Sequence, residues 1–358
     1  MTISDAKQID IALQGGGAHG AYTWGVLDRL LDDKGIEIEG ISGTSAGAMN
    51  AVALAQGLAD GGPQRAQELL AGFWTKVSEA ARMSPIQRSF FDMIMGRWSL
   101  DKSPSFILFE HLTRTFSPYE FNPLGINPLR DIVVEFFDFG VINNAKSPKL
   151  FLSATNVRTG RPKVFRQPEI SADTTMASAC LPFLFQAVEI DGEAYWDGGY
   201  MGNPPIFPLI DETDARDIVF VQINPFTRSK IPRTAYEINN RLNEITFNAS
   251  LMKELRAAAF LSEIIHHEKL DRQAYRDGRL HLIQSEHEMR KLSVSSKLNA
   301  EWAFLQHLHD IGWRTAEHWL AEHFEDLGVR SSWRPTFVFE ESLKPAHLAE
   351  DVKRREHK

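Results

Sequence analysis

Two strand–turn–helix units follow one another in the first 60 residues, and they constrain the fold more than any other feature. The apolar run IDIALQ (9–14) precedes the glycine-rich GGGAHG (15–20) and then a stretch whose apolar residues recur at helical spacing. IEIEGIS (36–42) leads into GTSAG (43–47) and a second helix-forming run, from Ala46 through Leu58. Strands that are each followed by a glycine-rich turn and a helix predict a parallel α/β sheet.

Later segments extend this pattern. KLFLSATNV (149–157) and DIVFVQI (217–223) predict strands, and the second has the continuous apolar character of a strand that is buried on both faces. SADTTMASACL (171–181) begins with a serine suited to cap a helix and ends before a proline. Residues 186–197 contain an Asp-Gly turn between two short apolar runs, which predicts a β-hairpin. The fold class that we predict is α/β with a mainly parallel central sheet.

The composition of the chain changes twice, which suggests how it is organised. Residues 84–128 are rich in phenylalanine and proline and poorly periodic, which predicts a cap or lid insertion. The alternative is an apolar rim that admits acyl chains or touches a membrane surface. After about residue 230 helical stripes dominate. We therefore expect an α/β domain over 8–230, a helical C-terminal region over 231–330 and a tail over 331–358.

Charge and cysteine content exclude several classes of protein. The 39 lysines and arginines against 47 acidic residues give a net charge of −8, which argues against a nucleic-acid binder. The single cysteine, Cys180, excludes an intrachain disulfide framework and a multi-cysteine metal site. The start MTISDAKQID lacks the features of a secretory signal, and the uncharged run Gly40–Ala59 consists mostly of small residues. We expect a cytoplasmic protein.

The pentapeptide GTSAG has the Gly-x-Ser-x-Gly form that places a nucleophilic serine on a sharp turn between a strand and a helix. Gly43 and Gly47 remove the Cβ atoms that would clash across such a turn. The helix that begins at Ala46 directs the positive end of its dipole at the serine, which favours a developing oxyanion. Ser45 is therefore our candidate nucleophile.

The glycine-rich GGGAHG offers free backbone N–H groups at the start of a helix, which is typical of an anion site. It also satisfies the G-x-G-x-x-G pattern of dinucleotide-binding folds, which predicts an acidic residue about 20 residues later, at the end of the second strand. Glu37 and Glu39 lie near that distance, but the strand runs into GTSAG instead. An oxyanion hole for Ser45 explains both motifs, whereas a nucleotide site explains only one.

A nucleophilic serine needs a base, and the residues leave two kinds of candidate. Asp197, in YWDGGY, ends a strand and precedes two glycines that permit a close backbone approach. Its carboxylate can accept the serine proton if it lies within reach and burial raises its basicity. The other candidates for a triad are the histidines late in the chain, most of which fall in or beside predicted helices: His266, His267, His281, His287, His307, His309, His318 and His323.

Three blocks in this order resemble the patatin-like phospholipase family, in its bacterial layout with a helical C-terminal extension: GGGAHG (15–20), GTSAG (43–47) and DGG (197–199). The stretch 177–205 is also similar to that family, and the resemblance covers about residues 8–225. It implies a three-layer α/β fold with a mainly parallel sheet.

The resemblance also implies a Ser–Asp dyad in place of a histidine triad, with Ser45 as nucleophile and Asp197 as general base. It implies an oxyanion hole built from Gly15, Gly16, Gly17 and Ala18. The remaining motif glycines would support the turns: Gly20, Gly43, Gly47, Gly198 and Gly199. One position departs from the family, which commonly has arginine or lysine where this chain has His19. A histidine is only partly charged near neutrality, so an auxiliary role for His19 would make activity depend on pH.

The implied activity is hydrolysis of carboxylic esters of lipids, of the phospholipase A or lysophospholipase type, through an acyl-enzyme. Neither a cofactor nor a metal ion is expected, and the expected partners are an acyl-ester substrate and a membrane or lipid surface. One alternative keeps the chemistry and acts on soluble esters or short storage-polyester oligomers. Another class is a non-catalytic lipid-binding or scaffold protein, which has no need for both Ser45 and Asp197.

Overall fold

The computed structural model describes residues 6–228, 231–267 and 278–335. Within these residues the chain forms one eight-stranded sheet in the order β5-β6-β3-β2-β1-β7-β8, with β4 paired to β3. The strands are β1 (Lys7–Leu13), β2 (Ile36–Gly43), β3 (Lys149–Asn156), β4 (Pro162–Arg166), β5 (Val188–Ile190), β6 (Glu193–Asp197), β7 (Asp217–Gln222) and β8 (Arg279–Gln284).

The strand directions confirm a mainly parallel sheet. The strands β1, β2, β3, β7 and β8 are parallel to their neighbours along this central run. Antiparallel pairing is confined to β4, β5 and β6, and β5 and β6 form the hairpin expected in 186–197. Leu13, Gly43 and Val221 share one register level, so β1, β2 and β7 end at the same edge of the sheet.

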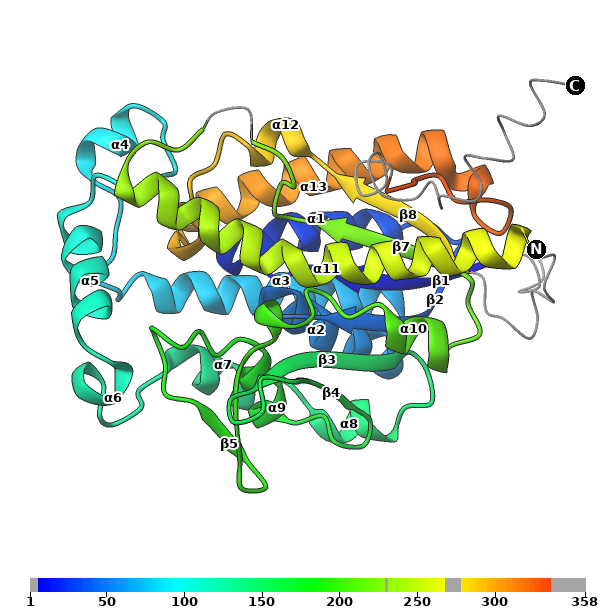
Figure 1. The fold of residues 1–358 in the computed structure, drawn as a ribbon, viewed down its shortest axis with the longest axis horizontal. Coiled ribbons are helices and arrows are strands. Elements are labelled where there is room, and N and C mark those ends of the chain that lie inside the picture. Colours follow the sequence, from blue (N-terminus) through cyan, green and yellow to red (C-terminus); the bar gives the residue numbers. More distant parts are fainter. Residues whose placement is uncertain (1–5, 229–230, 268–277, 336–358) are drawn as a thin grey trace, which may run out of the picture.

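Helices cover both faces of the sheet and give three layers (Figure 1). Successive side chains of a strand point to opposite faces, and β7 shows this directly. Val219 and Val221 belong to the larger core under one helical layer, whereas Ile218 and Phe220 belong to the smaller core under the other. The first layer holds α1 (Gly20–Leu31), α2 (Ala46–Asp60), α3 (Pro63–Ala81) and α13 (Trp302–His323), and the second holds α10 (Phe207–Glu212) and α11 (Ala235–His267).

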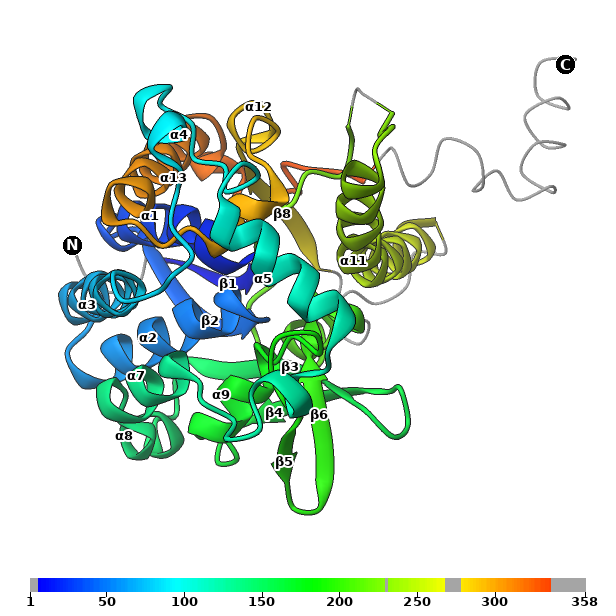
Figure 2. The same ribbon diagram turned by 90° about the vertical axis from the view of Figure 1, so that its left-hand side faces the viewer.

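The segment expected to form a cap folds into short helices at the end of the molecule where the parallel strands finish (Figures 1 and 2). These are α4 (Phe90–Ile94), α5 (Pro104–Thr115) and α6 (Pro118–Phe121). Four further helices lie in the α/β region or follow β8: α7 (Pro128–Phe136), α8 (Phe139–Asn144), α9 (Ala172–Ser178) and α12 (Glu286–Met289). Among the described residues, no helix is both long enough and apolar enough to cross a bilayer.

The C-terminal region is joined to the α/β core by a strand as well as by helices. The sequence analysis expected helices here, but β8 pairs in parallel with β7 along its whole length. The last long helix, α13, packs on α1, where the ring of Trp24 lies 5.9 Å from that of Trp302 and 4.2 Å from that of His309. Nε2 of His309 lies 2.9 Å from a carboxylate oxygen of Asp28. The region therefore completes both the sheet and one helical layer.

One carboxylate connects the C-terminal region to β7. Asp217, at the start of β7, accepts hydrogen bonds from Arg279 (2.9 and 2.6 Å) and from the N–H of Gly328 (3.1 Å), and lies 2.9 Å from Nε2 of His281. Burial alone would raise the pKa of Asp217, but the hydrogen bonds outweigh it and lower the pKa to about 2.

We expect Asp217→Asn to lower the free energy of unfolding at pH 7 by about 2–3 kcal/mol, because hydrogen bonds to a charged group are lost. A carboxylate with a lowered pKa stabilises the fold above its unfolded value of 3.8, and that stabilisation is lost as pH falls towards about 2. Urea titrations of both proteins between pH 7 and pH 3 measure this difference, which should shrink as the medium becomes acidic.

The control is Glu325→Gln, which removes the exposed ion pair with Lys7. It should change stability by less than about 0.5 kcal/mol, because solvent screens such pairs. A loss as small as the control's for Asp217→Asn would show that the carboxylate does not hold β8 to the sheet.

Candidate active site

Ser45 lies on the turn between β2 and α2, as the sequence predicted. Its backbone has φ 56° and ψ −122°, a conformation that is rare for any residue with a side chain and that marks strain. The turn is pressed against β1: a Cβ atom on Gly47 would lie 2.2 Å from the carbonyl oxygen of Leu13. Only glycine fits at that position. The strained turn places Ser45 at the positive end of α2.

The glycine-rich loop runs directly past this serine. Gly15 and Gly16 connect β1 to the 3₁₀ helix η2 (Gly17–His19), and Gly20 begins α1. A Cβ atom on Gly15 would lie 2.8 Å from Cβ of Ser45, so the loop and the turn are in contact. The two glycine motifs of the sequence therefore form one site.

The loop has free donors, but not at every glycine. The N–H of Gly15 donates to Oδ1 of Asn203 at 2.7 Å, so it is not available to a substrate. The N–H groups of Gly16, Gly17 and Ala18 have no acceptor among the residues that the structure describes. Of the four oxyanion donors expected from the sequence, Gly15 is therefore excluded, because Asn203 accepts its N–H.

Asp197 ends β6, and Gly198 and Gly199 follow it in the 3₁₀ helix η3 (Gly198–Tyr200). Register places Asp197 opposite Ala154 of β3, two residues beyond Leu152, which pairs with Gly43. Ser45 is likewise two residues beyond Gly43. The two candidate residues therefore reach the same level past the edge of the sheet, although the sequence separates them by 152 positions.

The Asp197 carboxylate is buried and only partly hydrogen-bonded. The residue has no exposed surface; Oδ1 accepts the N–H of Gly199 at 2.7 Å, and Oδ2 makes no full hydrogen bond to any described residue. Burial raises the pKa of Asp197 to about 7, and the Gly199 amide, the Ser45 hydroxyl and the Lys297 charge offset part of that effect. A carboxyl with such a pKa, next to a serine hydroxyl, can exchange a proton with it near neutrality.

His19 is enclosed by the protein and does not supply a charge. Its Nε2 lies 2.7 Å from Oγ of Ser296, and its ring packs edge-on against Phe304. Burial lowers the pKa of His19 well below its ordinary value, and the charges of Lys297 and Arg228 lower it further. The partly charged histidine considered from the sequence is therefore held neutral near pH 7.

The late histidines have other neighbours where the structure describes them. His281 lies beside Asp217, which is level with Ile38 on β2, five residues and about 16 Å before Gly43. The others contact Asp28 (His309), Trp98 (His307), Glu322 (His318), Asp326 (His323) and Glu288 (His287). The side chains of His266 and His267 lie outside the described residues. Among the described residues, no three His, Cys, Asp or Glu side chains form a group that could hold a metal ion.

Several polar residues of the site were not singled out from the sequence. The N–H of Ser45 donates to Oγ of Ser178 at 3.1 Å, and Oγ1 of Thr44 donates to the carbonyl of Gly202 at 2.7 Å. Asn203 follows the DGG block by a few residues, so its place in the family-like stretch 177–205 was the available signal. The N–H of Ala46, next to the serine, is a further donor that the position after the nucleophile suggests.

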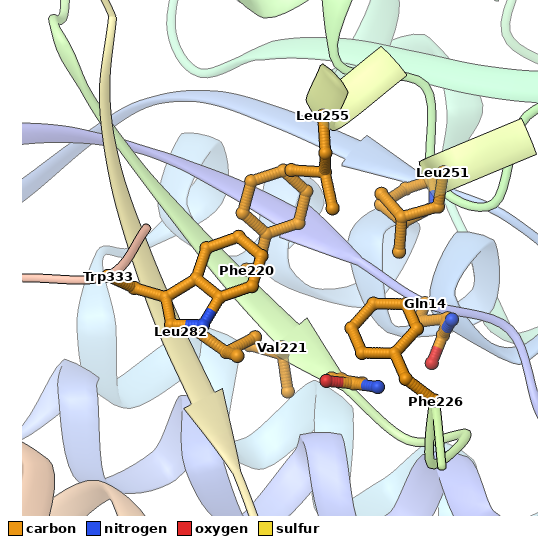
Figure 3. Close-up of a pocket in the computed structure, with 10 residues that line it drawn as sticks. Gln14, Phe220, Val221, Phe226, Leu251, Leu255, Leu282 and Trp333 are labelled. Atoms are coloured by element: carbon orange, nitrogen blue, oxygen red, sulfur yellow. The ribbon is translucent and has the colours of Figure 1, made fainter. Parts of the chain in front are cut away.

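A small cavity lies behind the site, between β7, β8 and α11 (Figure 3). Its volume is about 10 Å³, and its walls are almost entirely apolar, with the Gln14 amide at one end. A water molecule needs roughly 10–15 Å³, so the cavity is too small for an acyl chain. Among the residues that line it are Phe220, Phe226, Leu251, Leu255, Leu282 and Trp333.

Comparison with known families agrees with this geometry. A family model described as patatin-like phospholipase matches residues 11–210, which include the glycine loop, Ser45 and Asp197. The chain belongs to the patatin-like phospholipase family. The resemblance noted in the three sequence blocks is thereby confirmed.

Curated relatives of this patatin-like chain share part of it. A cGAMP-activated phospholipase of Pseudomonas aeruginosa is 29% identical over 209 residues, which cover 54% of this chain and 53% of the relative. Lysophospholipase NTE1 of Cryptococcus neoformans is 24% identical over 264 residues, which cover 67% of this chain and 14% of the relative. The chain thus spans about half the length of the first relative and a small part of the second.

Solved structures with some likeness include VipD from Legionella pneumophila, at 15% identity and a TM-score of 0.40, over 89% of this chain and 67% of that one. ExoU in complex with SpcU, from Pseudomonas aeruginosa, matches at 18% identity and a TM-score of 0.29, over 98% of this chain and 76% of that one.

The buried carboxylate has a consequence for stability that requires no substrate. A raised pKa means that ionised Asp197 opposes folding; this effect is absent below about pH 4, grows as pH rises to about 7 and is complete above it. We expect Asp197→Asn to raise the free energy of unfolding at pH 8 by about 2–4 kcal/mol, and to bring a much smaller gain at pH 5. Urea titrations at the two pH values measure both differences.

Asp173→Asn is the control, because Asp173 is an exposed acid paired with Arg130. It should leave stability within about 0.5 kcal/mol at both pH values. A destabilising Asp197→Asn at pH 8 would contradict the interpretation of this carboxylate as a desolvated base.

Proposed function

We propose that this protein is a serine acyl hydrolase that cleaves carboxylic ester bonds of lipids through a Ser45–Asp197 dyad. The observation that supports it best is the junction of three features: a strained serine, a carboxyl with no exposed surface and a pKa near 7, and a loop with free N–H groups. Each has a role in acyl transfer, and their combination has no evident structural purpose.

In the first half of the reaction, Oγ of Ser45 attacks the ester carbonyl carbon while the carboxylate of Asp197 takes the hydroxyl proton. The carbonyl oxygen becomes an oxyanion, which the N–H groups of Gly16, Gly17 and Ala18 bind. Asp197 then gives its proton to the leaving oxygen, the C–O bond breaks, and an alcohol or lysolipid departs. The acyl group remains on Ser45 as an ester.

In the second half, water attacks the acyl carbon and Asp197 accepts a proton from that water. The tetrahedral intermediate forms in the same loop. Its collapse breaks the bond to Oγ, the serine regains a proton from Asp197, and a fatty acid leaves. Each half of the reaction returns the carboxyl to its starting state, so a single titrating group serves both.

The preferred substrate in this proposal is a phospholipid or lysophospholipid. The names of the two curated relatives, a phospholipase and a lysophospholipase, support that class. Soluble esters and short storage-polyester oligomers are the second candidate, because this chain matches only about half of the first relative and 14% of the second, which leaves chain length and head group open. A scaffold role is disfavoured, because a protein that only binds gains nothing from a strained serine or from a destabilising buried acid.

We also propose that residues 84–128 act as a cap over the site. Ser45 is only 9% exposed, and α5 runs across the end of the molecule where the parallel strands finish (Figure 2). Movement of this segment would admit an acyl chain. In this proposal 8–230 is the hydrolase domain and 231–330 is packed on it, with a tail over 331–358, most of which lies outside the described residues.

The dyad is tested by hydrolysis of p-nitrophenyl esters of increasing chain length. Ser45→Ala and Asp197→Asn should each reduce kcat at least about 10³-fold, because each removes a group that the covalent step requires. In the wild type, activity should rise with pH up to about 7, since Asp197 must be ionised to act as a base. A preference for long chains would favour lipids over soluble esters.

The matched control is Asp173→Asn, at the exposed acid paired with Arg130. It should retain most of the activity. Near-full activity of Asp197→Asn would overturn the dyad and return attention to a histidine base. A wild type that binds phospholipid vesicles but cleaves no ester would favour the scaffold class.

We further propose that the cap segment contacts a lipid surface. It exposes large apolar side chains on three successive helices and their links, with Leu124 84% exposed and Leu108 59% exposed. Trp98, which lies in the same segment, packs on Phe304, with 5.1 Å between the rings. The exposed set is Met93, Ile94, Met95, Ile107, Leu108, Leu112, Phe116, Tyr119, Phe121, Leu124 and Ile126.

Flotation with phosphatidylcholine vesicles tests this contact. The combined change Leu108→Ser and Leu124→Ser should reduce the bound fraction several-fold, because apolar burial drives interfacial binding. Residues 84–128 hold four basic and four acidic side chains, so binding should change little with anionic lipid or salt. Val329→Ser, at an equally exposed apolar residue outside the cap, is the control. Equal flotation of all proteins would exclude the cap as the contact.

A further inference from the structure

A lysine outside the region matched by the family model reaches the back of the glycine loop. Lys297 lies on the 3₁₀ helix η4 (Val294–Leu298), and its Nζ donates to Oδ1 of Asn224 at 2.6 Å. The Nδ2 of Asn224 in turn donates to the carbonyl oxygen of Gly15 at 2.7 Å. Lys297 is therefore connected through one amide to the first residue of the loop.

The same helix also touches the loop directly, at two further points. Gly17 has φ +60°, and a Cβ atom there would lie 2.5 Å from the carbonyl oxygen of Lys297. Ser296 Oγ lies 2.7 Å from Nε2 of His19. Two successive residues of η4 thus contact the loop at Gly15 (through Asn224), at Gly17 and at His19. A residue with a side chain at position 17 would displace η4.

Asn224 is held so that it can transmit this contact. Its own N–H, and that of Ile223, donate to Oε1 of Gln14 at 2.7 and 2.8 Å. Nε2 of Gln14 donates to Oδ1 of Asn248 on α11 at 2.9 Å. The amide of Asn224 is therefore fixed at both its backbone and its side chain. On the other side of the loop, Asn203 holds the N–H of Gly15.

The charges around Lys297 decide whether it remains a cation. Part of the residue reaches the surface, but its ammonium group is enclosed, and burial lowers its pKa to about 8. Glu244 on α11 and Asp197 at the end of β6 raise that pKa, while Arg228 lowers it. Glu244 is itself paired with Arg228 and Arg241. His19 on η2 is neutral, so the described cations on this side of the loop are Lys297 and Arg228, and Arg228 is paired with Glu244.

We propose that Lys297 is a positioning residue of the oxyanion hole: through Asn224 and the backbone of η4, it fixes the Gly15–Ala18 segment so that the N–H groups of Gly16, Gly17 and Ala18 face the reacting carbonyl. The inference rests on the proposed acyl-transfer function. Lys297 touches neither serine nor carboxylate, and its charge adds to the stabilisation of negative charge that develops beside the loop. The C-terminal region thus completes the catalytic site.

Kinetics of ester hydrolysis separate this role from general stability. Lys297→Met should lower kcat by about 10–100-fold with KM within about two-fold, somewhat less than the loss of an oxyanion donor. Lys297→Arg, which keeps the charge, should recover most of that loss. The wild type should lose activity above about pH 8 as Lys297 deprotonates, and this alkaline limb should move to higher pH in Lys297→Arg. Lys291→Met, at an exposed lysine paired with Glu288 just before η4, is the control and should match the wild type.

Asn224→Asp provides a second route if Lys297→Met fails to fold. It keeps the size of the side chain but replaces the N–H donor to Gly15 by an acceptor, so kcat should fall by a similar factor. Full activity of Lys297→Met, or of Asn224→Asp where Lys297→Met does not fold, would overturn the proposal.

Hydrogen exchange measured by mass spectrometry gives a readout that is independent of activity. Peptides covering residues 14–20 should exchange at least about five-fold faster in Lys297→Met than in Lys291→Met, because loop opening becomes easier. If Lys297→Met exchanges faster but the wild type cleaves no ester, the contact between Lys297 and the loop is supported and the hydrolase function is rejected. If exchange and kcat are unchanged in Lys297→Met while the wild type cleaves esters through Ser45, the positioning role of Lys297 is rejected and the hydrolase function is retained.

Discussion

A carboxylate without exposed surface is the constraint around which the end of this sheet is arranged. Asp197 accepts one N–H bond, from Gly199, and the second oxygen has no full partner among the described residues. A protein could lower the free-energy cost of burying this group by pairing it with a cation, but that would also lower its pKa and, in the proposed mechanism, remove its value as a base. Here the charge of Lys297 offsets only part of the effect of burial on the pKa of Asp197, and the Lys297 ammonium group donates to Asn224 instead.

The remaining parts of the site are held in place by well-packed neighbours. The strained turn at Ser45 is held by contacts with β1, by Ser178 and by the segment after η3, so the strain is distributed over neighbours that are themselves well packed. The glycine loop is held by two asparagines on opposite sides. A loop fixed in this way keeps its free N–H groups in place before substrate arrives, which is the condition under which such donors stabilise a transition state most.

Much of this could be predicted from the sequence, because it depends on local patterns. Apolar runs, glycine-rich turns and helical periodicity located the strands β1, β2, β3 and β7, the hairpin, and the turn at Ser45. The side chains that complete the site could not be found in this way. Asn224 and Lys297 meet the loop more than 200 residues from it, and neither lies in a recognisable motif. The strand β8 was missed because six residues with a weak alternation do not differ enough from a helical segment. The neutral state of His19 depends on burial, which no local pattern reports.

The position of η4 in the chain has a consequence for how this fold can diverge. The family model ends at residue 210, whereas the lysine that contacts the glycine loop is at 297. In the proposed mechanism, selection can therefore alter the pH dependence of activity by exchanging a short segment that lies outside the motifs. Two relatives with the same nucleophile, base and loop can then work best in media of different alkalinity, and their shared domain would not reveal which is which.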